Sequence, residues 1–250
     1  MLKALIFDVD GTLADTERDG HRLAFNEAFH DAGLDWNWSV EMYGELLSIT
    51  GGKERIRHYL AQHHPNFSPA KDLDEFIAEL HASKTEHYCE LLAQGSIPLR
   101  TGVKRLLNEA REQGLRLAIA TTTTLPNVTV LLEHTLGVKS LEWFDIIGAG
   151  DIVPAKKPAP DIYLYVLEKM GWSPENCLAL EDSENGLASA AQANLKTVIT
   201  INDYTRGHNF DGAELVLDCY GEADSPFQVL AGDGAGSQYF SIDTARSLFS

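Results

Sequence analysis

Two aspartates, Asp8 and Asp10, follow an apolar run near the start of the chain, in the sequence LIFDVDGT. Because side chains alternate along a strand, residues two positions apart can face the same cavity. Two unpaired carboxylates at one place would repel each other, and one would be driven to hold a proton. A divalent cation such as Mg²⁺ removes this conflict, since it prefers oxygen ligands and commonly binds one or two carboxylates together with phosphate oxygens. The spacing therefore favours a metal-assisted reaction in which one aspartate attacks phosphorus and the other transfers a proton.

Three further stretches place residues suited to the same chemistry after apolar segments. Thr121 ends the run LAIAT, Glu181 and Asp182 end the run LALED, and Lys157 lies in AKKPAPD. Asp182 offers a second carboxylate to the cation. The hydroxyl of Thr121 and the ammonium of Lys157 can hold phosphoryl oxygens, on which negative charge is spread during transfer. Because ligands of open α/β sheets bind at the carboxyl ends of the strands, we expect these side chains to meet.

The elements that would position these residues follow from hydrophobic periodicity. Residues 16–94 contain only segments with helical spacing of apolar residues, whereas strand-like and helix-like segments alternate after Gly95. Such alternation is typical of a parallel sheet with helices on both faces. The pattern predicts an α/β fold with a Rossmann-like core over residues 1–15 and 95–250. A small helical domain is predicted as an insertion at residues 16–94.

The C-terminal part carries weaker signals. We expect the apolar stretch ELVLD, residues 214–218, to add an edge strand to the sheet. The glycine-rich stretch AGDGAG, residues 231–236, is expected to be a flexible loop. The stretch DTARSLF, residues 243–249, is predicted as a short closing helix.

The overall charge and the cysteines narrow the class of protein. With 37 acidic and 20 basic residues, the formal net charge is −17, so nucleic acid and anionic membranes are not expected as partners. The three cysteines, Cys89, Cys177 and Cys219, are scattered and form no zinc-binding spacing. No apolar run is long enough to span a bilayer, and the first residues make a poor signal peptide. These features favour a cytoplasmic protein, and we expect a monomer that acts on a small molecule.

The motifs FDVDGT, LAIAT, KKPAPD and ALEDSENG resemble, in order, the four motifs of the haloacid dehalogenase superfamily of phosphatases and phosphomutases. The resemblance covers the whole chain and implies a helical cap domain inserted into the core. It also implies that Asp8 is the nucleophile that becomes an aspartyl phosphate. Asp10 would be the general acid and base, and would bind the metal through its backbone carbonyl. The presence of Asp10 argues against the dehalogenase branch, which lacks this second aspartate.

The same resemblance assigns the remaining core positions. Asp182 would be a ligand of Mg²⁺ together with Asp8 and Asp10, and Glu181 would lie close to the ion or reach it through water. Thr121 and Lys157 would hold the phosphoryl group.

One subgroup is more similar than the rest, the CbbY-like sugar phosphatases. The similar stretches are LLSITGGKERIRHYL, LAFNE, KTEHY, ATTTTLPNV and YTR. The implied activity is removal of one phosphate from xylulose 1,5-bisphosphate, which gives xylulose 5-phosphate. The residues implied in contacts with the sugar and the distal phosphate are Glu17, Thr50, Gly51, Gly52, Lys53 and Arg55. Further candidates for substrate contacts are Lys84, Thr122 and Asn127.

One departure from the subgroup concerns His21. The stretch TERDGHR carries one more residue between Glu17 and His21 than the usual text of the subgroup. We therefore do not assign His21 to the site from the sequence.

Alternative interpretations stay open at this point. Residues 50–55 could simply begin a helix, with Lys53 and Arg55 in solvent. A phosphomutase of the β-phosphoglucomutase type would use the same aspartates as a phosphatase. A phospho-receiver without turnover would share an aspartate, a threonine and a lysine around Mg²⁺, but it has no use for the acid–base residue Asp10.

Overall fold

The computed structural model of the protein describes residues 1–95, 97–234 and 236–249. A seven-stranded sheet has the strand order β3-β2-β1-β4-β5-β6-β7. Neighbouring strands are parallel, except that β7 is antiparallel to β6. The strands are β1 (Ala4–Phe7), β2 (Arg116–Ala120), β3 (Ile146–Gly148), β4 (Cys177–Glu181), β5 (Lys196–Thr200), β6 (Leu215–Leu217) and β7 (Val229–Gly232). The predicted Rossmann-like α/β fold is confirmed.

Both faces of the sheet are buried at the central strands β1 and β4, as their near-continuous apolar runs require. On β1, Leu5 and Phe7 join an apolar cluster with residues of α5 (Val103–Glu112), α6 (Leu125–Leu136) and α9 (Ile242–Ser247). The alternate residues Ala4 and Ile6 join a second cluster with residues of α7 (Asp161–Met170) and α8 (Glu184–Gln192). The core therefore has three layers, with the sheet between two layers of helices. The carboxyl ends of the parallel strands lie along the same edge of the sheet.

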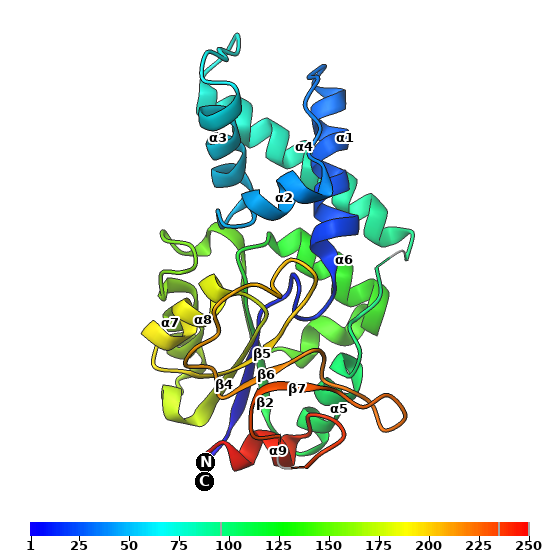
Figure 1. Cartoon of the computed structure of the whole chain (residues 1–250), viewed down its shortest axis with the longest axis vertical. Coiled ribbons are helices and arrows are strands. Elements are labelled where there is room, and N and C mark those ends of the chain that lie inside the picture. Colours follow the sequence, from blue (N-terminus) through cyan, green and yellow to red (C-terminus); the bar gives the residue numbers. More distant parts are fainter. Residues whose placement is uncertain (96, 235, 250) are drawn as a thin grey trace.

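In the described residues between β1 and α5 the chain forms four α-helices. They are α1 (Arg22–Asp31), α2 (Val40–Leu46), α3 (Gly52–His63) and α4 (Leu73–Ala93), and a π-helical turn, Glu17–His21, precedes them. Figure 1 shows these helices at one end of the molecule and both chain termini at the opposite end. They pack around their own apolar cluster, which includes Phe25, Phe29, Trp36 and Trp38. We call residues 16–94 the helical insert; its helical character was predicted correctly.

Short 3₁₀ turns complete the connections at Val138–Trp143, Gly150–Ile152 and Pro174–Asn176. None of the helices in the described part of the chain combines the length and the apolar character needed to cross a membrane.

Two predictions for the C-terminal part need correction. The segment 214–218 does contain a strand, β6, but β6 is not at the edge, because β7 pairs outside it. Ala231 and Gly232 belong to β7, so the loop prediction was wrong for these two residues. Ala235 lies outside the described residues. The residues of β7 are all exposed and show no apolar alternation, so only their hydrogen bonds to β6 define the strand. The closing helix is confirmed as α9.

Candidate active site

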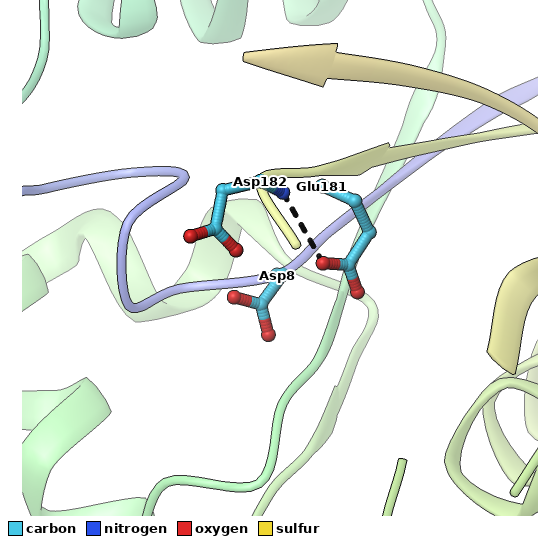
Figure 2. A group of neighbouring side chains, drawn as sticks. All are labelled: Asp8, Glu181 and Asp182. Carbon is cyan, nitrogen blue, oxygen red and sulfur yellow. Dashed lines mark hydrogen bonds between the residues drawn. The ribbon is translucent and has the colours of Figure 1, made fainter. Parts of the chain in front are cut away.

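Three carboxylates meet where the adjacent parallel strands β1 and β4 end (Figure 2). Asp8 directly follows β1, Glu181 is the last residue of β4, and Asp182 follows it. Each residue offers an oxygen, and these oxygens lie within 4.8 Å of one another. All three residues are buried. The meeting is a result of register, because Phe7, the last residue of β1, pairs with Leu180, and the next residue of each chain segment is then a carboxylate, Asp8 or Glu181.

Lys157 provides the positive charge of this cluster. Its Nζ atom lies 2.7 Å from Oδ1 of Asp8 and 2.5 Å from Oε1 of Glu181. The hydroxyl of Tyr163 on α7 donates a second hydrogen bond to Oε1 of Glu181, at 2.6 Å. The sequence did not single out Tyr163, whose side chain is fully buried. These contacts hold Glu181 beside the ammonium of Lys157.

The donor set fits a divalent cation. Burial raises the pKa of Asp8 to about 8, although Lys157 acts to lower it. Burial, followed by repulsion from Asp8 and Glu181, raises the pKa of Asp182 well above its ordinary value. Because three carboxylates share one ammonium, the fully ionised cluster carries two negative charges in excess. A divalent ion bound by oxygen ligands would neutralise that excess.

The side chain of Asp10 is held by hydrogen bonds from Thr16 and from the ring of His21. Oδ1 of Asp10 accepts from the Thr16 hydroxyl at 2.5 Å and lies 2.9 Å from Nε2 of His21. Nδ1 of His21 lies 2.6 Å from Nζ of Lys84, on α4. Burial acts to raise the pKa of Asp10, but the interactions with His21 and Thr16 outweigh burial and lower the pKa to about 2. In this arrangement Asp10 is a carboxylate.

The π-helical turn explains how His21 reaches Asp10 despite the additional residue before it. In a π-helix the hydrogen bonds join residues five apart, so the turn takes up one residue more than an α-helical turn. Here the amide of Arg22 donates to the carbonyl of Glu17. His21 was missed as a site residue in the sequence, and the additional residue was the signal that could have found it.

The two residues expected to hold a phosphoryl group, Thr121 and Lys157, border the same cavity. Thr121 follows β2 and is buried, and its hydroxyl accepts a hydrogen bond from the amide of Thr123 at 3.3 Å. Thr121, Thr122 and Lys157 border a cavity of about 200 Å³, together with Asp8 and other residues. We call this space the main cavity. Its border also includes Asp10, Glu181 and Asp182.

A smaller cavity of about 40 Å³ lies beside the main one and shares Asp10, Glu17, Arg55 and Thr122 with it. Lys84 and Asn127 border only the smaller cavity. Nδ2 of Asn127, at the start of α6, donates to the hydroxyl of Thr123 at 2.8 Å.

Part of the helical insert covers the main cavity through Glu17, Thr50 and Arg55. The hydroxyl of Tyr43 donates to Glu17 and accepts from Nη1 of Arg55 at 3.0 Å, which links the two charged groups. Arg55 is buried and does not point into solvent, contrary to the simple helix-start interpretation. Nδ2 of Asn185, on α8, donates to the hydroxyl of Thr50 at 3.1 Å, so core and insert are joined at the cavity.

Of the three described residues that follow Thr50, the two glycines border one of these cavities and the lysine borders neither. Gly51 has a φ of +98° just before α3, and Gly51 and Gly52 border the smaller cavity. Lys53 is not among the described residues that border either cavity. Its ammonium instead forms an ion pair with Asp151, an exposed residue outside the helical insert. Asp151 also forms an ion pair with Lys156, at 2.6 Å.

Comparisons with known proteins agree with this arrangement. Residues 2–194 match the family model of the haloacid dehalogenase-like hydrolases. The chain is 52% identical over 213 residues to the protein CbbY of Rhodobacter capsulatus, which covers 85% of this chain and 91% of that protein. It is 41% identical over 222 residues to a CBBY-like protein of Arabidopsis thaliana, which covers 88% of this chain and 69% of that protein.

Solved structures are similar as well. The structure of CbbY from Rhodobacter sphaeroides in complex with phosphate matches with a TM-score of 0.83 and 48% identity, over 89% of this chain and 96% of that one. The mutant D10N of that protein, in complex with xylulose-(1,5)bisphosphate, matches equally well. A β-phosphoglucomutase from Clostridium difficile matches at 24% identity with a TM-score of 0.69, over 88% of this chain and 92% of that one, and shows the shared fold alone. The chain belongs to the haloacid dehalogenase-like hydrolases, in the group that includes the CbbY proteins.

Proposed function

We propose that the protein is a Mg²⁺-dependent phosphatase that removes one phosphate from xylulose 1,5-bisphosphate and releases xylulose 5-phosphate. The observation that carries the proposal is the position of Asp8. Its carboxylate accepts a hydrogen bond from the ammonium of Lys157, lies within 4.8 Å of a carboxylate oxygen of Asp182, and borders the main cavity. The similarity to a CbbY protein that was crystallised with this bisphosphate supports the choice of substrate.

In the first half of the reaction, an oxygen of Asp8 forms a bond to phosphorus while the ester bond to the sugar breaks. Asp10 gives a proton to the leaving sugar oxygen. The phosphate dianion of a bound substrate, lying beside Asp10, would raise the pKa of this carboxyl and so favour the protonated form that the step needs. Lys157 and Thr121 hold the phosphoryl oxygens during the transfer.

In the second half, water attacks the phosphorus atom of the aspartyl phosphate on Asp8, and inorganic phosphate leaves. Asp10 takes a proton from this water, and its hydrogen bonds from Thr16 and His21 favour the carboxylate form that can do so. A Mg²⁺ ion held by the side chains of Asp8 and Asp182 and by the carbonyl of Asp10, with Glu181 nearby, would supply charge neutralisation for the phosphoryl group.

The helical insert would bind the rest of the substrate and act as a cap domain. Glu17 and Thr50 offer acceptors to sugar hydroxyls, and Arg55 offers a cation to the distal phosphate. Gly51 and Gly52 leave space beside them, and Lys53 supplies a second cation if it leaves Asp151. Lys84, Thr122 and Asn127 would complete the wall that faces the sugar.

The proposal is tested with a panel of sugar monophosphates and bisphosphates that includes xylulose 1,5-bisphosphate and ribulose 1,5-bisphosphate. Phosphate release is measured with Mg²⁺, with EDTA, and with EDTA followed by excess Mg²⁺. We expect the highest kcat/KM for xylulose 1,5-bisphosphate, no release in EDTA, and recovery with Mg²⁺. Full activity of a metal-free protein would refute the role of the ion, and a clear preference for another ester would refute the substrate.

The mutase alternative is decided by the product. If a second sugar hydroxyl, in place of water, accepted the phosphoryl group from Asp8, a sugar monophosphate would give an isomeric ester and no free phosphate. We expect free phosphate, and the fold shared with a β-phosphoglucomutase does not favour either outcome.

A further inference from the structure

Arg100 lies on the segment that returns from the helical insert to the core, between α4 and α5. Its side chain is 7% exposed. Among the described residues, the hydrogen bonds and the ion pair of the guanidinium group go to backbone carbonyls, a hydroxyl and a carboxylate of other segments. The partners are the carbonyls of Gly11, Thr200, Ile201 and Asp218, the hydroxyl of Thr200 and the carboxylate of Asp15.

These partners lie in three separate segments, each at or after the end of a strand of the sheet. Gly11 is in the loop after β1, Ile201 follows β5, and Asp218 follows β6. Carbonyls beyond the ends of strands have lost their sheet partners, and buried carbonyls need a donor. The planar guanidinium offers five N–H donors in a fixed geometry, so Arg100 can satisfy several of them together. One side chain thus ties the Gly11 loop to the ends of two strands.

Two of the three tied segments, the Gly11 loop and the residues after β5, lie beside the carboxylate of Asp182. A Cβ atom at Gly11 would lie 2.1 Å from Oδ2 of Asp182, so the backbone passes directly beside that oxygen. Asn202, the residue after Ile201, donates from Nδ2 to the same oxygen at 2.7 Å. The positions of Gly11 and Ile201 therefore determine where Oδ2 of Asp182 can lie.

We propose that Arg100 is a positioning residue for the cation site, which acts by fixing Gly11 and Ile201 around the carboxylate of Asp182. In the described part of the chain it forms no hydrogen bond or ion pair with the carboxylate cluster, although its positive charge also acts on Asp182 and favours the ionised carboxylate. Because a cation at Asp8 and Asp182 is part of the proposed function, this role of Arg100 rests on that function.

Arg105 offers a matched control within the same core. Its Nη2 atom donates to the carbonyls of Tyr220 and Gly221 and to that of Phe240, at 3.0 to 3.1 Å. Like Arg100, it ties separate backbone segments together, but none of these three carbonyls belongs to the Gly11 loop or to the residues after β5. Loss of Arg105 should lower the thermal stability without a change in metal binding.

The test compares Arg100→Met, Arg100→Lys and Arg105→Met with the wild type. Mg²⁺ binding is measured by titration calorimetry on EDTA-treated protein, and thermal unfolding is measured without metal. Removing groups that orient metal ligands typically weakens binding by about 10- to 100-fold, so we expect the Kd for Mg²⁺ to rise by about tenfold or more in Arg100→Met. Arg100→Lys should show a smaller rise, because a single ammonium cannot reach all of the carbonyls. Arg105→Met should bind Mg²⁺ as the wild type does.

Wild-type Mg²⁺ affinity in both Arg100 variants would overturn the inference, as would an equal loss of affinity in Arg105→Met. If Arg100→Met does not fold, Arg100→Lys decides between the two results. Absence of Mg²⁺ binding by the wild type is a different result, because it contradicts the proposed function itself.

Discussion

Nζ of Lys84 lies 2.6 Å from Nδ1 of His21, so a residue in the helical insert bears on the orientation of Asp10, the proposed proton-transfer residue. An ammonium group has donors and no acceptor, so Lys84 must donate to Nδ1. The ring proton of His21 is then on Nε2, from which it is donated to Oδ1 of Asp10 at 2.9 Å. Insert and core meet in this chain of hydrogen bonds, which therefore depends on the charge of Lys84.

Burial lowers the pKa of Lys84 to about 8, and this predicts a pH dependence. Below pH 8 the ammonium is charged and supports His21, whereas above pH 8 Lys84 loses that charge and the support weakens. We expect kcat/KM to fall on the alkaline side with an apparent pKa near 8. In Lys84→Arg the charge persists, so the fall should move to higher pH even if the maximum rate is lower. Identical alkaline profiles in wild type and Lys84→Arg would show that another group titrates.

Gly186 on α8 is predicted to be required for the position of Glu181. A Cβ atom at this residue would lie 1.9 Å from Oε2 of Glu181, whose carboxylate is fixed by Lys157 and Tyr163. Alanine is a better helix former than glycine by about 1 kcal/mol, so helix propensity alone would make Gly186→Ala stabilising. We expect instead that Glu181 and Lys157 are displaced, and that kcat falls by about 100-fold.

The matched control for this substitution is Gly207→Ala. Apart from Gly207 and its two chain neighbours, no atom of the described residues would lie within 4 Å of a Cβ at Gly207, so this variant should keep the wild-type kcat. A Gly186→Ala protein that is fully active and more stable than the wild type would show that the close approach to Glu181 has no functional role.

Lys53 can bind the substrate directly or act through its ion pair with Asp151, and substitutions at the two residues distinguish these roles. Both side chains are well exposed, and such pairs contribute about 0.2 to 1 kcal/mol, so the ammonium can leave Asp151 for a substrate phosphate at little cost. We expect Lys53→Ala to raise KM for the bisphosphate by about tenfold, the loss of one charge-assisted hydrogen bond. Asp151→Ala should leave KM unchanged or lower it. If both variants raise KM equally, and the double variant no further, Lys53 acts through Asp151 and not on the substrate.

Much of the fold and of the site could be predicted because the relevant signals are local. Asp8, Thr121 and Asp182 each follow a buried apolar strand, and parallel strands bring such positions to one edge whatever lies between them in the chain. Lys157 was recognised from its own motif. The Rossmann-like core and the helical insert followed from periodicity for the same reason.

The features that could not be predicted depend on partners far away in the chain. The carbonyls of Gly11 and Asp218, which Arg100 binds, are 89 and 118 residues from it in the chain. No local sequence pattern predicts these contacts. In the sequence, Tyr163 occupies an ordinary apolar position of a predicted helix. Its link to the site is visible only from its hydrogen bond to Glu181. His21 required the hydrogen-bond register of a π-helical turn, and β7 required its pairing with β6.

The most direct test of the central claim is phosphate release from xylulose 1,5-bisphosphate by Asp8→Asn in saturating Mg²⁺, beside the wild type. The substitution is nearly isosteric and removes the charge of a carboxyl whose pKa burial already raises, so the variant should fold and keep its thermal stability. We predict that it releases no phosphate above the uncatalysed rate, because no carboxylate remains to attack phosphorus. Turnover by a folded Asp8→Asn protein at a rate near that of the wild type would contradict the account.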